Sequence, residues 1–292
     1  MTAHNDALIA RLDALIALVS DHLSTGLSAP DWSSSVAFQY RKSGAKGRLH
    51  PVQFVSKIGL DDIREVDAQK EKILANTERF IAGLPANNVL LTGARGTGKS
   101  SLIKACLNAF APQGLRLIEM DKTDLVALPE VVELIADRPE RFIVFCDDLS
   151  FDEGDSAYKA LKSVLDGSVA ATSANVLVYA TSNRRHLLPE YMSENMTYSH
   201  TPDGEVHPGE GVEEKISLSE RFGLWLSFYP FSQDEYLSVV NQWLQAMGVD
   251  SASLDAARPE ALVWALERGS RSGRVAYQFA CDFVGRLRQS NA

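Results

Sequence analysis

Between residues 87 and 230, short runs of apolar residues alternate with segments whose apolar residues recur every three or four positions. The runs have the length of buried β-strands, and the longer segments have the period of α-helices. Apolar strands that alternate with helices are typical of a parallel sheet that helices cover on both faces. The pattern therefore predicts an α/β fold. The expected strands of this five-stranded parallel sheet lie at residues 88–93, 114–121, 141–148, 175–183 and 224–230.

The two ends of the chain depart from this central pattern. From Phe231 onward the apolar runs stop, and three helical patterns predict a small all-α domain. Residues 8–23 carry the apolar stripe of an amphipathic helix, which either packs against the core or contacts a partner. Residues 29–51 are rich in serine, glycine and basic residues, a composition typical of a linker or an extended arm. The expected organisation is an N-terminal helix and basic arm (1–55), a core (56–230) and a helical domain (231–292).

One segment interrupts the alternation of strands and helices. Residues 190–215 contain Pro-Asp-Gly and Pro-Gly turn signals, and seven acids against one lysine. We interpret the segment as an exposed insertion, for which a hairpin is one form. Its two histidines, His200 and His207, have no cysteine beside them, so a solvated loop is a better interpretation than a metal site.

Composition narrows the class of protein. A chain of 292 residues with 45% hydrophobic and 23% charged residues has the composition of an ordinary folded protein. No apolar run approaches the roughly 18 residues of a membrane helix. Three scattered cysteines without a Cys-x-x-Cys motif favour a cytoplasmic location. The net charge of −9 argues against nucleic-acid binding by the surface as a whole, although a local basic patch remains compatible with it.

A phosphate-binding motif lies between the first expected strand and the helix that follows it. Residues 93–100 fit the pattern G-x-x-x-x-G-K-[ST]. The glycines let backbone N–H groups approach phosphate oxygens, Lys99 would bridge the β- and γ-phosphates of ATP, and the hydroxyl of Ser100 would bind Mg²⁺. The candidate nucleotide-binding residues are Gly93, Ala94, Arg95, Gly96, Thr97, Gly98, Lys99, Ser100 and Ser101.

Two acids follow the third apolar run. In a P-loop site, an acid at the end of a neighbouring strand completes the metal site, and Asp147 is placed for this role. Asp148 is then placed to orient or activate the attacking water. The alternative is that Asp148 only caps the turn after the strand.

The P-loop, the apolar strand with paired acids, and the fourth strand ending in Thr181-Ser182-Asn183 resemble the AAA+ ATPases. This resemblance implies that Asn183 is the sensor 1 residue that positions the lytic water. Residues 219–223 resemble the segment with the arginine finger, which implies that Arg221 acts in trans in a homo-oligomer. Residues 272–276 resemble the sensor 2 motif of a helical lid, which gives Arg274 a role at the γ-phosphate. Each arginine has an alternative role in a surface salt bridge.

Three longer sequence segments make the resemblance more specific. Residues 59–83, 145–155 and 213–231 are similar to a bacterial family known as domain of unknown function 815, a family of predicted ATPases without an assigned substrate. The second acid of AAA+ proteins is usually glutamate, whereas Asp148 is one methylene shorter. A misplacement near 1 Å can cost about a hundredfold in rate, so we expect slow hydrolysis or help from Asp152 or Glu153.

The expected function is an ATP- and Mg²⁺-dependent AAA+ ATPase that remodels a partner. A nucleotide-gated switch with negligible hydrolysis and a monomeric P-loop kinase of a small molecule are the alternatives. The basic arm at residues 41–48 offers four cations to a phosphate backbone, but a solvated linker has the same composition. A protein partner is therefore favoured over nucleic acid, and membrane insertion is not expected.

Overall fold

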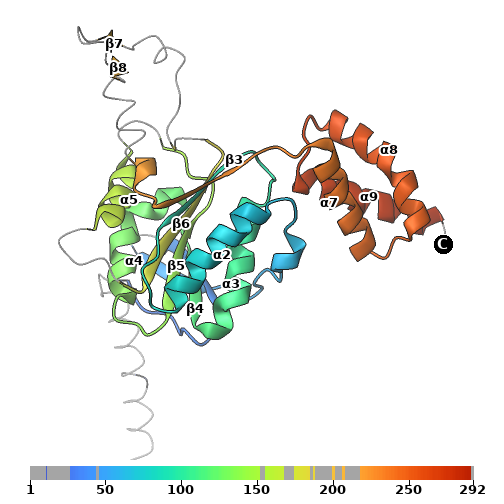
Figure 1. Cartoon of the computed structure of the whole chain (residues 1–292). Helices are drawn as coiled ribbons and strands as arrows, with labels where there is room; N and C mark the ends of the chain where they lie inside the picture. The colour runs from blue at the N-terminus through green and yellow to red at the C-terminus, as the bar shows by residue number, and fades with distance from the viewer. Residues whose placement is uncertain are drawn as a thin grey trace, which may run out of the picture.

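The computed structural model describes residues 11, 27–43, 46–151, 155–167, 174–184, 187, 199–200, 206–207 and 218–290. Figure 1 shows an α/β core joined to a C-terminal helical unit. Apart from Arg11, the amphipathic helix expected at 8–23 lies outside the described residues, as does most of the insertion at 190–215. The described part of the insertion pairs two short antiparallel strands, β7 (Ser199–His200) and β8 (Val206–His207), which is the hairpin arrangement considered above.

The core contains a seven-stranded sheet in the order β2-β1-β4-β5-β6-β3-β9. Its strands are β1 (Ala37–Ser43), β2 (Lys46–Pro51), β3 (Val89–Gly93), β4 (Leu115–Glu119), β5 (Arg141–Cys146), β6 (Val176–Ser182) and β9 (Leu224–Phe228). All neighbours are parallel except β1 and β2, which are antiparallel. The five apolar runs all form strands, so the α/β prediction is confirmed. The count of five strands is wrong, because the N-terminal segment adds two.

The two additional strands come from the segment expected to be a linker or an arm. Phe38, Tyr40 and Leu49 alternate with polar residues and are buried on one face of the hairpin. Trp32 packs edge-on against Phe38, with ring centroids 4.8 Å apart, and against Phe142 of β5 at 5.0 Å. Burial of these large side chains stabilises the hairpin on the edge of β4. The interpretation of residues 29–51 as a linker is therefore wrong. Their apolar residues alternate with serines and basic residues with the period of two that is typical of a strand.

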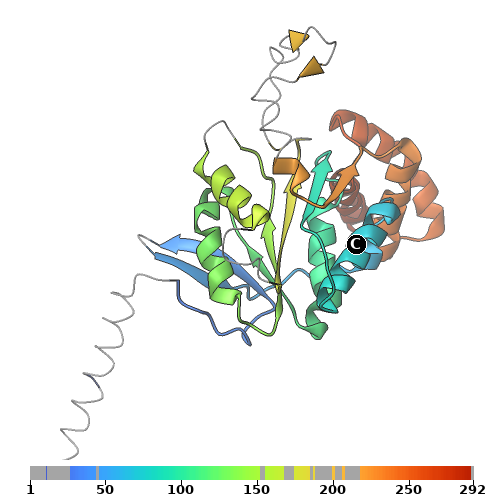
Figure 2. The ribbon, with the colours of Figure 1, turned by 60° about the vertical axis from the view of Figure 1, so that its left-hand side comes forward.

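Helices cover both faces of the sheet. They are α2 (Asp67–Ile81), α3 (Lys99–Phe110), α4 (Leu128–Ile135) and α5 (Ser156–Asp166), with 3₁₀ turns η1 (Leu60–Asp62), η2 (Ala111–Gln113) and η3 (Lys122–Ala127). Figure 2 shows α2 and α3 on one side of the sheet and α4 and α5 on the other. Each pair buries its apolar residues in a separate hydrophobic cluster, so the sheet forms the middle layer of three.

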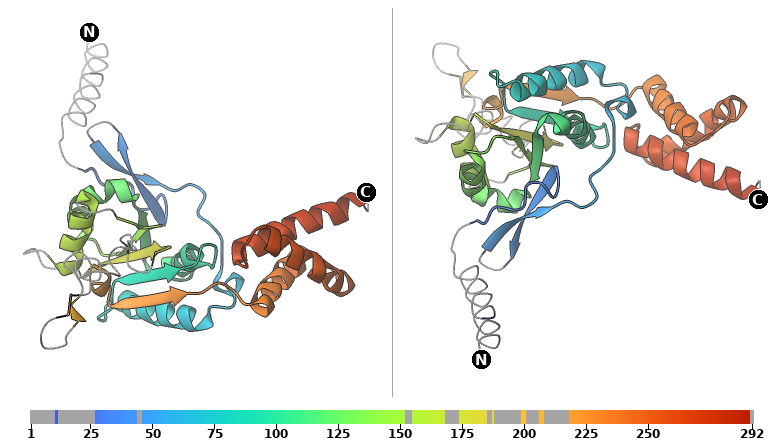
Figure 3. Two further views of the ribbon diagram at one scale, coloured as in Figure 1. Left: turned by 90° about the horizontal axis from the view of Figure 1, so that it is seen from above. Right: turned by 90° about the horizontal axis from the view of Figure 1, so that it is seen from below.

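The C-terminal unit consists of three helices, as the sequence predicts. They are α7 (Gln233–Ala246), α8 (Ser251–Glu267) and α9 (Gly273–Ser290). The helix α7 begins with a capping box, in which Ser232 and Glu235 each accept a hydrogen bond from the other's backbone N–H. Figure 3 shows this unit to one side of the core, joined to it by the segment after β9. We call it the lid. Across the part of the chain that the structure describes, no helix is both long and apolar enough to cross a membrane.

Candidate nucleotide-binding site

The phosphate-binding loop connects the end of β3 to the start of α3. Gly96 and Gly98 have φ values of +74° and +98°, which residues with a Cβ atom rarely adopt. A Cβ atom on Gly96 would also lie 2.8 Å from Oγ of Ser272, at the start of the lid segment that carries α9. The loop is therefore closely contacted by the lid, and glycine is required at its apex. Within this loop and the first turn of α3, residues 95–101 line one cavity.

Lys99 is buried, with 6% of its surface exposed, although it carries a charge. Its Nζ donates to the backbone oxygens of Gly93 and Ala94, both at 2.8 Å, and to Oδ1 of Asn183 at 3.2 Å. Desolvation lowers the pKa of Lys99, and the nearby carboxylates of Asp147 and Asp148 oppose this effect. A partly desolvated ammonium group that can exchange carbonyl and amide oxygens for other acceptors is suited to bind phosphate oxygens.

Asp147 lies directly beyond β5 and next to the start of α3. The hydroxyl of Ser100 donates to its Oδ1 at 2.6 Å, and the hydroxyl of Thr181, on β6, donates to the same oxygen. A carboxylate and a hydroxyl in contact beside a phosphate-binding loop fit Mg²⁺, which prefers oxygen ligands and keeps several waters. The structure thus brings together the two predicted metal ligands, Asp147 and Ser100. Thr181 is a third residue in this hydrogen-bonded group, and the sequence alone gives it no role in the site.

Asp148 adopts a left-handed backbone conformation, with φ of +51°. Aspartate tolerates this conformation better than most residues with a side chain. Its backbone N–H donates to Oγ1 of Thr181 at 2.9 Å, and Nδ2 of Asn183 donates to its carboxylate. The next helix, α5, has its own cap, Asp155, which accepts from Ala157 at 3.0 Å. The carboxylate of Asp148 is therefore oriented toward the end of β6.

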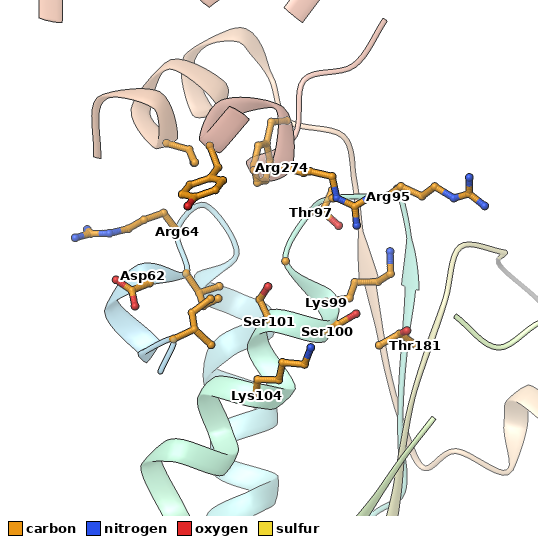
Figure 4. A pocket seen from close by; sticks show the side chains of 18 of the residues that line it. Asp62, Arg64, Arg95, Thr97, Lys99, Ser100, Ser101, Lys104, Thr181 and Arg274 are labelled. Carbon is orange, nitrogen blue, oxygen red and sulfur yellow. The ribbon is translucent and has the colours of Figure 1, made fainter. Parts of the chain in front are cut away.

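Arg274 reaches the site from the lid. Its backbone N–H donates to the carbonyl of Gly96 at 3.2 Å, so the first turn of α9 touches the phosphate-binding loop. Figure 4 shows its side chain beside Thr97, above the side chain of Lys99. Arg274 also contributes to lowering the pKa of Lys99, as a neighbouring cation does. The predicted sensor 2 arginine thus lines the same cavity as Asp148 and Asn183.

The cavity has a volume of about 1010 Å³ and extends beyond the phosphate-binding residues. One wall beyond the loop is apolar and aromatic, and the charged side chains of Lys57, Asp62, Arg64 and Lys104 also line the cavity. The side chains of the apolar wall belong to Ile58, Ile63, Phe231, Val239, Trp243 and Tyr277. The rings of Trp243 and Tyr277 meet edge-on, with centroids 4.9 Å apart. Flat apolar walls suit the base of a nucleotide. These residues are not evident as site residues from the sequence, because they resemble ordinary core positions and come from widely separated segments.

Arg221 does not line this cavity. Its Nε donates to Oδ1 of Asp166, at the end of α5, and the two side chains form an ion pair. The surface salt bridge considered as its alternative role is therefore present. Asp152 and Glu153, named as acids that assist Asp148, lie outside the described residues. Elsewhere in the described ranges, no group of three histidine, cysteine, aspartate or glutamate side chains is placed to hold a metal ion.

The arrangement of helices and strands in this chain is similar to that in solved structures of other proteins. A proline-to-glycine mutant of RuvB from Thermotoga maritima is 17% identical, with a TM-score of 0.52, and the match covers 80% of this chain and 68% of that chain. The AAA domain of FIGL-1 in complex with ADP is 16% identical, with a TM-score of 0.50, and the match covers 80% and 75%. The fold is that of the AAA+ P-loop ATPases.

The chain belongs to the family described as "Protein of unknown function (DUF815)", which matches residues 33–287. Both resemblances stated from the sequence are thereby confirmed. A comparison with curated proteins gives no significant match.

Proposed function

We propose that this protein binds and hydrolyses ATP with the help of Mg²⁺. The observation that carries the proposal is the contact network in which Lys99, Asn183 and Asp148 meet at the phosphate-binding loop. A site that only binds nucleotide needs the cation and the loop, whereas an oriented carboxylate beside them serves the attack of water. The magnesium ion, held by Asp147 and Ser100, would neutralise charge on the phosphate oxygens.

In this proposal each side chain has a separate task. Lys99 exchanges its carbonyl partners for phosphate oxygens. Asp148 accepts a proton from the attacking water, and Asn183 holds the carboxylate in place. Arg274 adds positive charge from the lid, so that closure of the lid and completion of the site are the same event.

We further propose that Arg221 acts in a neighbouring subunit of a homo-oligomer. Its position outside the cavity of its own chain supports a role in trans, for which Arg221 would have to exchange its ion pair with Asp166. Arginine fingers supplied in trans raise the rate by about 10³ to 10⁵. ATP turnover would then move the lid against the core and remodel a macromolecular partner in the cytoplasm.

A nucleotide-gated switch is the second candidate function. It is favoured by Asp148 itself, which is shorter than glutamate and already bound by Asn183. In a switch, ATP would bind and close the lid, but water would not be activated efficiently.

Two measurements on the full chain distinguish these functions. Calorimetry with a non-hydrolysable ATP analogue reports binding, and phosphate release reports turnover. An ATPase requires binding that is lost in Lys99→Met and turnover that is lost in Asp148→Asn with binding retained. Binding without turnover at any protein concentration would support the switch, and equal affinity in wild type and Lys99→Met would refute the nucleotide site.

A further inference from the structure

Thr181 lies on β6, at the edge of the sheet where the phosphate-binding loop and the two acids meet. In the ladder between β5 and β6, the last pair is Cys146 and Ala180. The next residues along these two parallel strands, Asp147 and Thr181, therefore lie level with each other. Figure 4 shows the side chain of Thr181 close to the start of α3, and this side chain lines the nucleotide cavity. The site thus contains a threonine, only 2% exposed, to which the proposed function gives no task.

The hydroxyl of Thr181 joins the two acids. It donates to Oδ1 of Asp147 and accepts from the backbone N–H of Asp148 at 2.9 Å. The direction of both bonds is determined, because an ionised carboxylate can only accept, a backbone N–H can only donate, and a hydroxyl has a single hydrogen. One oxygen atom therefore fixes the carboxylate of the first acid relative to the peptide group of the second.

The turn that carries the acids is also tied to β6 through the backbone. The N–H of Leu149 donates to the carbonyl of Thr181 at 2.7 Å, and the hydroxyl of Ser182 donates to the carbonyl of Leu149 at 2.6 Å. Asp148 precedes these contacts in its left-handed conformation, which few residues with a side chain adopt. Since the N–H groups of Asp148 and Leu149 both bond to Thr181, the conformation of the turn depends on this residue.

Two hydroxyls donate to the same oxygen of Asp147. The second belongs to Ser100, at 2.6 Å, and Ser100 is itself a proposed ligand of Mg²⁺. Among the described residues that donate to this carboxylate, Thr181 is therefore the partner outside the proposed ligand set. Partners of this kind orient a metal ligand, and their loss costs about 10- to 100-fold in metal affinity or activity.

We propose that Thr181 is a positioning residue of the nucleotide site. Its hydroxyl holds the carboxylate of Asp147 in the orientation that binds Mg²⁺, and it holds the turn at Asp148 so that the second carboxylate stays directed toward Asn183. The proposal rests on the ATP- and Mg²⁺-dependent function proposed above. A purely structural role, in which Thr181 fills space between two strands, would require the shape of threonine but not its hydroxyl.

The test separates the hydroxyl of Thr181 from its shape. Calorimetry with a non-hydrolysable ATP analogue, in excess Mg²⁺ and in EDTA, gives the gain in affinity that the metal provides, and phosphate release gives kcat. The full chain is measured as wild type, Thr181→Val, Thr181→Ser and Thr181→Ala. Valine keeps the branched shape of threonine without the hydroxyl, and serine and alanine make the same comparison without the methyl group.

The matched control is Thr92→Val, on the adjacent strand β3. Thr92 is as buried as Thr181, and its hydroxyl accepts from Nε1 of Trp225 at 2.7 Å rather than bonding an acid. This variant therefore removes a buried threonine hydroxyl next to the site and leaves both acids with their partners. Thermal melting of each variant verifies that it folds.

Thr181→Val should reduce the gain in affinity from Mg²⁺ by about 10- to 100-fold and lower kcat by a similar factor. Its affinity in EDTA should equal that of the wild type, because the phosphate-binding loop and Lys99 are intact. Thr181→Ser and Thr92→Val should stay close to the wild type, and Thr181→Ala should resemble Thr181→Val. If Thr181→Val does not fold, the difference between Thr181→Ser and Thr181→Ala decides the result.

A wild-type affinity gain and kcat in folded Thr181→Val, or equal values in Thr181→Ser and Thr181→Ala, would overturn the role of Thr181 while leaving the proposed function intact. Failure of the proposed function is seen in the wild type instead. A wild-type affinity that Mg²⁺ does not raise would overturn both proposals. Binding that Mg²⁺ strengthens, but without turnover, would overturn hydrolysis and the role of Thr181 toward Asp148, and the affinity gain would then decide its role toward Asp147.

Discussion

The side-chain amide of Asn183 donates to the carboxylate of Asp148, and the same amide accepts from the ammonium group of Lys99 at 3.2 Å. One side chain at the end of β6 therefore holds both the acid that would activate water and the cation that would bind phosphate. A phosphate group that draws Lys99 toward itself would leave Asn183 bound to Asp148 alone. The position of the acid is thus linked to the occupancy of the loop.

Asn183→Ala should lower the rate of ATP hydrolysis by about 10²- to 10³-fold, because removal of one positioned polar group from a catalytic site has effects of this size. Affinity for a non-hydrolysable ATP analogue should change little, since Lys99 keeps its charge. Phosphate release under single-turnover conditions and calorimetry measure the two effects. A comparable fall in affinity and rate would instead assign Asn183 to nucleotide binding.

Asp148→Asn should reduce turnover by about 10²- to 10⁴-fold, the range for loss of a general base. Asparagine tolerates the left-handed backbone conformation at this position, so the melting temperature should stay near that of the wild type. Retained turnover in a folded Asp148→Asn protein would exclude Asp148 as the base.

Arg221→Ala should abolish most turnover while leaving nucleotide affinity nearly unchanged, because a finger in trans acts on the transition state. The rate per chain of the wild type should rise with protein concentration. Mixing Arg221→Ala with Asp148→Asn should partly restore activity, since some interfaces would pair an intact acid with an intact arginine. As a control, Asp166→Asn removes the ion-pair partner of Arg221 and keeps the arginine. A rate that is independent of concentration, with no recovery on mixing, would exclude the oligomeric mechanism.

Glu119 provides a test of the electrostatics at the carboxyl end of β4. Desolvation, with smaller effects from Asp147 and Asp121, raises the pKa of Glu119 above 4.5, although Lys104 opposes the shift. A carboxyl group whose pKa is higher in the folded state favours folding below its unfolded pKa, and this contribution is lost as the pH rises through the folded pKa. Glu119→Gln should therefore raise the melting temperature at pH 7 relative to the wild type, and by less at pH 4. The matched control is Glu71→Gln, which removes one exposed charge from α2. An equal rise in melting temperature for both variants at both pH values would contradict a raised pKa of Glu119 in the folded protein.

Much of the core and of the phosphate site can be predicted from the sequence, because both depend on local patterns. The apolar run at residues 141–146 specifies a buried strand without reference to the rest of the chain. The glycines and Lys99 specify a loop with defined chemistry. Asp147 follows from its place at a strand end, since the carboxyl ends of parallel strands meet at one edge of the sheet, whereas Asn183 follows from the resemblance to the AAA+ ATPases.

The parts that the sequence does not predict depend on contacts between distant segments. The place of Thr181 in the site follows only from the folded structure, in which its hydroxyl donates to Asp147 and accepts from the backbone N–H of Asp148. Trp243 and Tyr277 lie on two helices of the lid and meet only after the lid folds. The composition of residues 29–51 does not predict the β1–β2 hairpin, because large apolar residues such as Phe38 and Tyr40 are rare there among many serines and basic residues.

Strand β1 also determines where the chain can be shortened. It pairs with β4 through Ala37, Phe38 and Gln39, and so covers backbone groups that would otherwise form the edge of the central sheet. An uncovered edge of a largely apolar sheet pairs readily with other chains and aggregates. A shortened protein that begins at residue 56 would keep every predicted catalytic side chain and still precipitate. The smallest chain that keeps the nucleotide site in solution therefore begins before Trp32.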